Sequence, residues 1–313
     1  MTNANKFIVI ISVLIVSAFF IKATQQPNEL NTDSEKSNSK IDLTVKKTKD
    51  NYEIKALKMP ENLSFAGERV PIEIQDVYER MDRELLVNTF WQSNALLYIK
   101  RANKYFPTIE KILAENGIPD DFKYLALIES GLLNATSPAG AKGFWQIMRT
   151  TGKENGLEIN KNVDERFHLE KATKVACNYL KKAHQKFGSW TTAAAAYNAG
   201  RAGILKQLDK QQVTNYYDLL LGNETSRYVF RIIAAKEILT HPLKYGFAFD
   251  KHDLYTKKET YTVEVDSIIK NIANFARYYG MNYKEFKILN PWLRENTLNN
   301  ASHKKYQITL PRK

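Results

Sequence analysis

A short segment in the middle of the chain places a glutamate where its carboxyl group would be hard to ionise. Pro119 and Asp120 are typical of a helix start and Gly131 of a helix end, so a helix is predicted over residues 119–131. Glu129 would lie beside an apolar stripe at the C-terminus of that helix, and both settings disfavour a carboxylate. Such a Glu would keep its proton near neutral pH and could act as a general acid. A solvated glutamate at a helix end is the alternative that this segment leaves open.

Three further blocks combine aromatic rings with amides and small residues. They are the segments 137–148, 196–200 and 224–229. Aromatic faces stack on sugar rings, and amides pair with hydroxyl and acetamido groups, so the combination suits a carbohydrate site. Each block by itself is more often part of a protein core. The candidates that these blocks contribute are Ser137, Gln146, Tyr197, Asn198 and Tyr228.

The numbers of cysteine and histidine residues argue against a disulfide-stabilised protein and against a metalloenzyme. The 313 residues include one cysteine, Cys177, and five histidines. A single cysteine excludes an internal disulfide and a cysteine-based metal cage. The histidines are scattered, without a metal-ligand spacing such as HExxH. We therefore expect no metal and no cofactor. The net charge of +12 is compatible with a polyanion, a membrane surface or an acidic polymer as partner, and does not choose among them.

The elements that must position these candidates are predicted to be mainly α-helical. Between Val70 and His241, apolar residues recur three and four apart. The run Ala193–Ala196 predicts a tightly packed, buried helix. Ordered structure is predicted to begin near Phe65. Helix breaks are predicted at Pro107, Gly117–Pro119, Pro138, Gly188 and Gly222.

The last part of the chain has a different pattern. Residues 261–263 and 306–310 are typical of short strands, and residues 268–279 and 283–289 are typical of short helices. A β-α-α-β module of about fifty residues is near the lower size limit for a self-sufficient core. The predicted fold class is therefore mainly α, with a small β-α-α-β module at the C-terminus.

The N-terminal residues predict export. Lys6 precedes an almost wholly apolar run over residues 7–21, which is typical of a signal peptide. The run is shorter than the ~20 residues that comfortably span a bilayer. A cleaved signal peptide and an uncleaved membrane anchor over residues 1–24 both stay open, and either would export the rest of the chain. The polar residues 25–60 are predicted to be a linker.

The order and spacing of four motifs resemble a known family. Together they resemble the lytic transglycosylase domain of the soluble-lytic-transglycosylase type, and within it the membrane-bound lytic murein transglycosylase D group. The resemblance runs from about Asn62 to Ile238, and it implies a catalytic domain with a lysozyme-like α fold, over residues 61–248. The four motifs are Glu129-Ser130, Gly143-Phe144-Trp145-Gln146, Ala196-Tyr197-Asn198-Ala199-Gly200, and Glu224-Thr225 followed by Tyr228-Val229.

The resemblance implies a role for each candidate residue. Glu129 corresponds to the single catalytic acid and base of the family. Ser137 corresponds to the serine that contacts the N-acetyl group beside the cleaved bond, although the interval between the two is one residue shorter than in many relatives. Phe144 and Trp145 replace a more common Leu-Met pair, which bears on the shape of a subsite and not on the reaction. The other correspondences are the cleft amide Gln146, Tyr197 near the acid with Asn198 beside it, and the cleft-lining Tyr228.

The C-terminal module, assigned to residues 260–313, is similar to a LysM domain. That β-α-α-β fold binds glycans that contain N-acetylglucosamine. The matching residues include Tyr279-Gly280 and Leu289-Asn290-Pro291, whereas Val265-Asp266 stands where the family has Gly-Asp. Glycan binding by this module and a purely packing role both stay open.

The reaction that the resemblance implies uses one carboxyl group. Ordinary glycosidases pair two, about 5 Å apart for retention or about 6.5–9.5 Å for inversion. The best candidates for a second one, Asp164 and Glu165, match structural positions. Glu129 would protonate the bond between N-acetylmuramic acid and N-acetylglucosamine, while the N-acetyl group oriented by Ser137 stabilises the positive charge. Glu129 would then take a proton from the C6 hydroxyl, which closes a 1,6-anhydro ring.

Two alternatives use the same cleft differently. A hydrolytic muramidase would use water as its nucleophile, and a non-catalytic wall-binding protein would hold the glycan without cutting it. A nucleic-acid binder is not expected, because the chain is predicted to be exported and contains no recognised nucleic-acid motif. The expected partners are peptidoglycan glycan strands, with contact to the inner or outer membrane through the N-terminal segment. The enzyme is expected to be a monomer in the periplasm or cell envelope.

Overall fold

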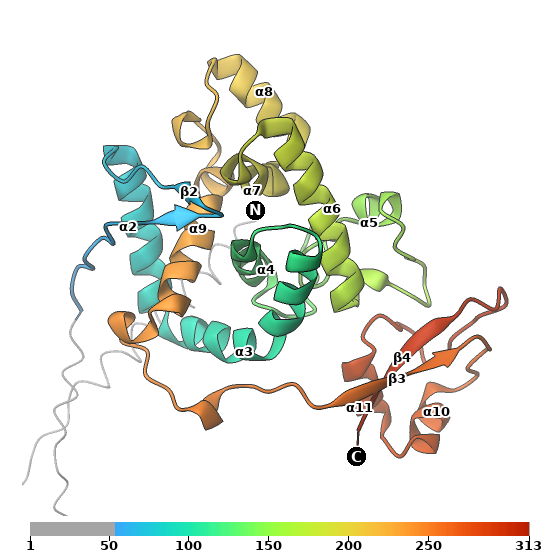
Figure 1. Ribbon diagram of the computed structural model, residues 1–313. Helices are drawn as coiled ribbons and strands as arrows, with labels where there is room; N and C mark the ends of the chain where they lie inside the picture. The colour runs from blue at the N-terminus through green and yellow to red at the C-terminus, as the bar shows by residue number, and fades with distance from the viewer. Residues whose placement is uncertain (1–53, 313) are drawn as a thin grey trace, which may run out of the picture. The chain divides into compact units, whose positions relative to one another are not determined.

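The computed structural model describes residues 54–312 (Figure 1). The predicted signal or anchor segment and most of the predicted linker lie outside the described residues. Within residues 54–312, no helix combines the length and the apolar character needed to cross a membrane. The packed part of the chain begins with Leu57 and Met59, slightly before the predicted start at Phe65, because both side chains contact the helical core.

Residues 54–254 are mostly helical. A short antiparallel hairpin, β1 (Ser64–Phe65) and β2 (Glu68–Arg69), precedes the helices. Short 3-10 turns join several of them, including η1 (Asp120–Phe122) and η2 (Glu165–Phe167). The helices are α2 (Gln75–Phe90), α3 (Gln92–Glu115), α4 (Lys123–Ser130), α5 (Arg149–Glu154), α6 (Leu169–Phe187), α7 (Trp190–Ala199), α8 (Arg201–Gln211) and α9 (Asn223–Thr240).

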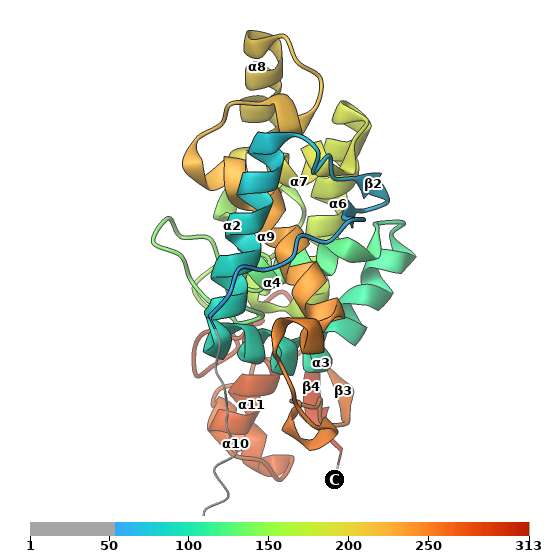
Figure 2. The same cartoon turned by 90° about the vertical axis from the view of Figure 1, so that its left-hand side faces the viewer.

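Two helices lie at the centre of this arrangement. Helix α4 packs against α3 and α9, and α7 packs against α6, α8 and α9 (Figures 1 and 2). The side chains of Ala193–Ala196 in α7 are fully buried, as predicted. Because alanine carries a single methyl group, the neighbouring helices can approach α7 closely. The N-terminus of α7 is closed by Ser189, which accepts a hydrogen bond from Thr192 N–H at 3.2 Å.

Helix α3 continues through Pro107, so the predicted break there is wrong. Proline removes a backbone donor and usually interrupts a helix. Here the buried Phe106, Ile109 and Leu113 lie on both sides of it, and Pro107 itself faces solvent. Tertiary packing of that apolar face keeps the helix intact, since packing contributes more to helix stability than intrinsic propensity does. The breaks predicted at 117–119, Gly188 and Gly222 are confirmed.

The C-terminal module has the predicted β-α-α-β order. Strands β3 (Thr260–Val265) and β4 (Tyr306–Pro311) pair antiparallel, with α10 (Ile272–Tyr278) and α11 (Tyr283–Leu289) between them in sequence. Helix α10 starts four residues later than predicted, because Asn271 caps it by accepting a hydrogen bond from Asn274 N–H at 2.9 Å. The predicted fold class, mainly α with this small module, is confirmed.

Candidate active site

Helix α4 ends immediately after Glu129, and the end is fixed by backbone geometry. Gly131 closes the helix with φ of 62°, in the left-handed region that favours glycine. A side chain there would also crowd Arg101 Nη1 and the ring of Tyr98, each 3.2 Å from an added Cβ. The predicted helix end is therefore confirmed. At the helix start, Asp121 does not cap the helix; its carboxylate accepts hydrogen bonds from Ala66 N–H and Lys236 Nζ, both at 2.7 Å.

The partly buried carboxyl group of Glu129 has a perturbed pKa. Burial raises the pKa above its ordinary value. A hydrogen bond that Tyr228 donates to Oε1 and the positive charge of Arg231 both act in the opposite direction, and the negative charge of Glu224 raises the pKa further. The net effect raises the pKa of Glu129, so its carboxyl group stays protonated to a higher pH than that of a solvated glutamate.

Two tyrosines from different helices lie near Glu129, of which Tyr228 is buried and Tyr197 is partly buried. Tyr228 of α9 donates its hydrogen to the carboxyl group. Tyr197 of α7 donates to the main-chain oxygen of Trp145 at 2.8 Å, and its ring packs edge-on against Tyr179. Burial raises the pKa of both Tyr197 and Tyr228 well above the ordinary value, and the nearby charge of Glu129 adds to the rise. Both phenols therefore stay protonated and act as hydrogen-bond donors.

The loop over residues 135–147 follows α4 and carries two more candidates. Ser137 Oγ accepts from Ala141 N–H at 3.0 Å, and Gln146 Nε2 donates to Gly143 O at 2.8 Å. These hydrogen bonds lie within the loop, so they shape the loop itself. The structure thus brings Tyr197, Tyr228 and Glu129 together, and it holds Ser137 and Gln146 in the adjoining loop.

Asn198 connects two helices next to Glu129. Its side chain accepts from Thr225 Oγ1 at 2.7 Å and donates to Glu224 Oε1 at 3.3 Å, which ties the end of α7 to the start of α9. The sequence analysis included Glu224 only as part of a family motif, and it did not select Arg231. The helical spacing of Arg231, three residues after Tyr228, is the signal that would have placed both on one face of α9.

Two family models match the chain on either side of residue 240. Residues 107–220 match the model described as "Transglycosylase SLT domain". We refer to the matched residues 107–220 as the SLT domain. Residues 261–313 match the model described as "Soluble lytic transglycosylase C-terminal LysM-like domain". The predicted resemblances to a transglycosylase SLT domain and to a LysM-like module are confirmed.

Two curated proteins are similar to this chain. The chain is 29% identical over 219 residues to the membrane-bound lytic murein transglycosylase D of Escherichia coli (strain K12), an alignment that covers 68% of this chain and 47% of the relative. It therefore spans about half the length of the curated relative that it matches. It is also 28% identical over 125 residues to a tributyltin chloride resistance protein of Alteromonas sp. (strain M-1), covering 39% of this chain and 58% of the relative.

One solved structure is similar over part of the chain. It is an inactive mutant of the lytic transglycosylase Slt from Pseudomonas aeruginosa. The similarity covers 49% of this chain and 26% of that one, with 19% identity and a TM-score of 0.35.

Two buried carboxylates in the SLT domain, Asp164 and Glu165, form ion pairs with neighbouring basic residues. Asp164 forms a bidentate pair with Arg166, at 2.9 Å to Nε and 2.8 Å to Nη2. Burial alone would raise the pKa of Asp164, but hydrogen bonds and charge from Arg166 lower it below its ordinary value. Glu165 is also buried and pairs with Lys171. Both carboxylates are thus committed to ion pairs of their own, which agrees with the structural role predicted for them.

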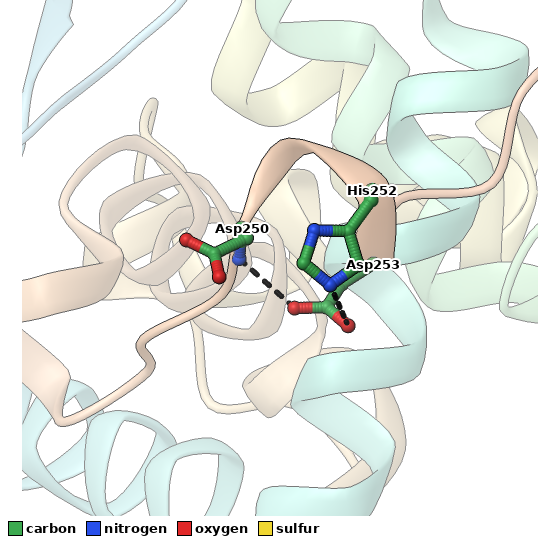
Figure 3. Close-up of side chains that lie close together, drawn as sticks. All are labelled: Asp250, His252 and Asp253. Carbon is green, nitrogen blue, oxygen red and sulfur yellow. Dashed lines mark hydrogen bonds and ion pairs between the residues drawn. The ribbon is translucent and has the colours of Figure 1, made fainter.

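One group of side chains has the composition of a cation site. Among the described residues, Asp250, His252 and Asp253 are the group whose possible ligand atoms lie within 4.8 Å of one another (Figure 3). Asp253 accepts a hydrogen bond from Asp250 N–H at 2.9 Å and so caps the short turn η5 (Lys251–Asp253). Capping accounts for the proximity of these side chains, and we assign no metal to them.

Proposed function

We propose that this chain is a peptidoglycan lytic transglycosylase that takes part in cell-wall remodelling. It would cleave the β-1,4 bond between N-acetylmuramic acid and N-acetylglucosamine without water and leave 1,6-anhydromuramic acid ends. One observation carries the proposal: in a chain with an SLT domain, Glu129 has a raised pKa and a single direct phenol partner, Tyr228. The name of the E. coli relative, which refers to murein, supports the choice of substrate.

The first chemical step uses Glu129 as an acid. Tyr228 donates to Oε1, so the proton of neutral Glu129 belongs on Oε2, and that oxygen would deliver it to the glycosidic oxygen. The sugar acquires positive charge as the bond breaks. The neighbouring N-acetyl group, oriented by Ser137, would stabilise this charge. Gln146, Tyr197 and Asn198 would line or support the glycan cleft.

The second step uses the same carboxyl group as a base. Glu129, now ionised, would accept the proton of the muramyl C6 hydroxyl, whose oxygen attacks C1 and closes the anhydro ring. One group that serves as acid and then as base needs a pKa near the working pH. Partial burial together with the hydrogen bond from Tyr228 suits Glu129 to both roles.

A hydrolytic muramidase is the second candidate, and one observation favours it. Glu224 is a second carboxylate whose charge acts on Glu129. It is exposed and accepts a hydrogen bond from Asn198 Nδ2 at 3.3 Å. In a muramidase it would activate a water molecule, whereas in a transglycosylase it would only tune the acid.

The proposal also covers the domain bounds, the oligomeric state and the location of the chain. We take residues 61–248 as the catalytic domain and residues 260–313 as a module that binds glycan. The chain would act as a monomer in the periplasm or at the envelope, where its substrate lies. The printed name of the E. coli relative, which includes the term membrane-bound, supports that location.

The test is a digestion of purified peptidoglycan by residues 25–313, followed by mass analysis of the released muropeptides. Ends of 1,6-anhydromuramic acid would support a lytic transglycosylase. Reducing ends, which are heavier by one water molecule, would support a muramidase. No release, with the protein still sedimenting with the wall, would support a binding protein. The variant Glu129→Gln is the control for contaminating activity.

A further inference from the structure

The segment over residues 158–167 of the SLT domain is part of the core of the C-terminal module. Val163 and Phe167 are buried, and they belong to the same hydrophobic cluster as Trp292 and Leu293. Val163 forms a β-bridge with Leu293. The guanidinium group of Arg294 lies over the ring of Phe167, 4.2 Å from its centre. The SLT domain therefore supplies two side chains to a core that is near the lower size limit for self-sufficiency.

Hydrogen bonds hold the module to the same segment. Asp164 N–H donates to Trp292 O at 2.8 Å. The side chain of Asn162 donates to Thr297 O at 2.7 Å and accepts from Asn299 N–H at 2.9 Å. The carboxylate of Glu158 accepts from Tyr306 Oη at 2.9 Å and from Lys304 Nζ at 2.6 Å.

The same segment also supports the 135–147 loop. Arg166 is 3% exposed, and its Nη1 donates to Gly140 O at 3.0 Å and to Ile147 O at 3.2 Å. Its main-chain oxygen lies so close to Gly143 that an added Cβ would be 2.0 Å away. Arg166 is held in place by Asp164, whose main-chain N–H contacts the module. One buried ion pair thus links the module to the loop.

The loop is in turn attached to the groups around Glu129. Ser130, the residue after Glu129, donates from Oγ to Phe144 O at 2.9 Å. Tyr197 donates to Trp145 O at 2.8 Å. Movement of the loop would therefore disturb the surroundings of the acid as well as the candidates Ser137 and Gln146.

We propose that the docked C-terminal module positions the 135–147 loop through Asp164 and Arg166, and that Arg166 is a positioning residue for the reaction at Glu129. The module then supports catalysis through protein contacts, in addition to any glycan that it holds. The effect on reaction rate rests on the proposed function, whereas the coupling between module and loop does not.

Two variants of the full chain distinguish the contacts that residues 158–167 make to the C-terminal module from those that they make to the 135–147 loop. Glu158→Ala combined with Asn162→Ala removes side-chain contacts to the module and leaves Arg166 untouched. Arg166→Lys keeps the charge but loses the geometry that reaches both Asp164 and the loop. Glu264→Ala is the matched control, because it breaks a Glu–Lys pair inside the module, with Lys305 at 2.8 Å.

Hydrogen exchange measures the coupling directly. The N–H groups of Lys142, Gly143 and Ile147 are hydrogen-bonded within the loop, at 2.9–3.1 Å. We expect their exchange to accelerate in the Glu158/Asn162 double variant and in Arg166→Lys, and to be unchanged in Glu264→Ala. Unchanged exchange in a folded double variant would overturn the proposal.

Activity on a tetrasaccharide fragment tests the consequence, since so short a glycan is not expected to reach the module and the cleft together. Arg166→Lys should lose about 10-fold in kcat/KM, mainly in kcat, because a small displacement of positioning groups is costly. The pH dependence should keep its position, because the partners of Glu129 are retained. A loss confined to long strands, with normal loop exchange, would show instead that the module acts by holding glycan. Failure of the wild-type chain to cut any glycan would refute the proposed function, while the exchange result would still decide the coupling.

Discussion

Tyr228 of α9 donates a hydrogen bond to Oε1 of Glu129 at the end of α4, across 99 residues of sequence. The phenol is buried and stays neutral, so it can donate to either protonation state of the carboxyl group. This hydrogen bond is stronger when Glu129 is ionised, because hydrogen bonds to a charged acceptor are stronger than those to a neutral one. Tyr228 therefore limits how far burial can raise the pKa of Glu129, and the following predictions test that balance.

Replacement of the acid should strongly reduce turnover. Glu129→Gln keeps the shape and the hydrogen bond from Tyr228 but cannot transfer a proton. We expect the rate of muropeptide release to fall by about 10²–10⁴-fold, the usual contribution of a general acid and base. Sedimentation with peptidoglycan should be retained. Cleavage at the wild-type rate by a folded Gln variant would contradict the assignment.

The same variant should be more stable than the wild type at neutral pH. The pKa of Glu129 is raised in the folded state, so its contribution to stability is fully present below the pKa of the unfolded chain and is lost as pH rises through the folded pKa. Gln cannot ionise and escapes this loss. Denaturant unfolding should show equal free energies near pH 4 and a higher free energy for Glu129→Gln near pH 7. An equal difference at both pH values would indicate a cause other than ionisation.

Removal of the phenol should move the pH profile upward. Tyr228→Phe deletes the hydrogen bond that lowers the pKa of Glu129, so that pKa should rise. The step that needs protonated Glu129 then fails at a higher pH, and the basic limb of kcat/KM should shift in that direction. Tyr197→Phe is the matched control, because its hydrogen bond goes to Trp145 O. It should leave the position of the limb unchanged, whatever its effect on rate.

Neutralising Glu224 should have the opposite effect. Its negative charge raises the pKa of Glu129, so Glu224→Gln should lower that pKa and move the basic limb of kcat/KM to lower pH. The products should still carry anhydro ends. If the variant instead loses all cleavage while Tyr228→Phe retains some, Glu224 takes part in the chemistry, and a muramidase mechanism gains support.

Alanine at two helix-ending glycines should separate backbone strain from crowding. Gly131 and Gly188 have φ of 62° and 68°, where alanine costs about 1–2 kcal/mol. A Cβ at Gly131 also meets Arg101 and Tyr98 at 3.2 Å, whereas one at Gly188 meets nothing within 4 Å. Gly131→Ala should therefore lose more free energy of unfolding than Gly188→Ala, and it alone should lose activity, because it disturbs the end of α4. Equal losses of stability and activity would contradict this.

Features that depend on neighbours in sequence could be predicted. The end of α4 follows from Gly131, whose missing Cβ permits a left-handed residue. The buried helix at Ala193–Ala196 follows from four small apolar residues in succession. The extended conformation of β3 and of β4 agrees with the strand-forming residues within each segment. In each case the determining interactions lie within a few residues of one another, where sequence patterns record them.

Features that depend on contacts between distant parts of the chain could not be predicted from the sequence. Nothing near Pro107 shows that α3 continues, since the packing that keeps it helical comes from other parts of the chain. The charges of Glu224 and Arg231 act on Glu129 only because α9 folds against α4. Arg166 supports the 135–147 loop from 26 residues away at Gly140. Electrostatic and hydrogen-bonding energies depend on distance in space, which local periodicity does not encode, so folding of the helices around α4 was needed to bring these groups together.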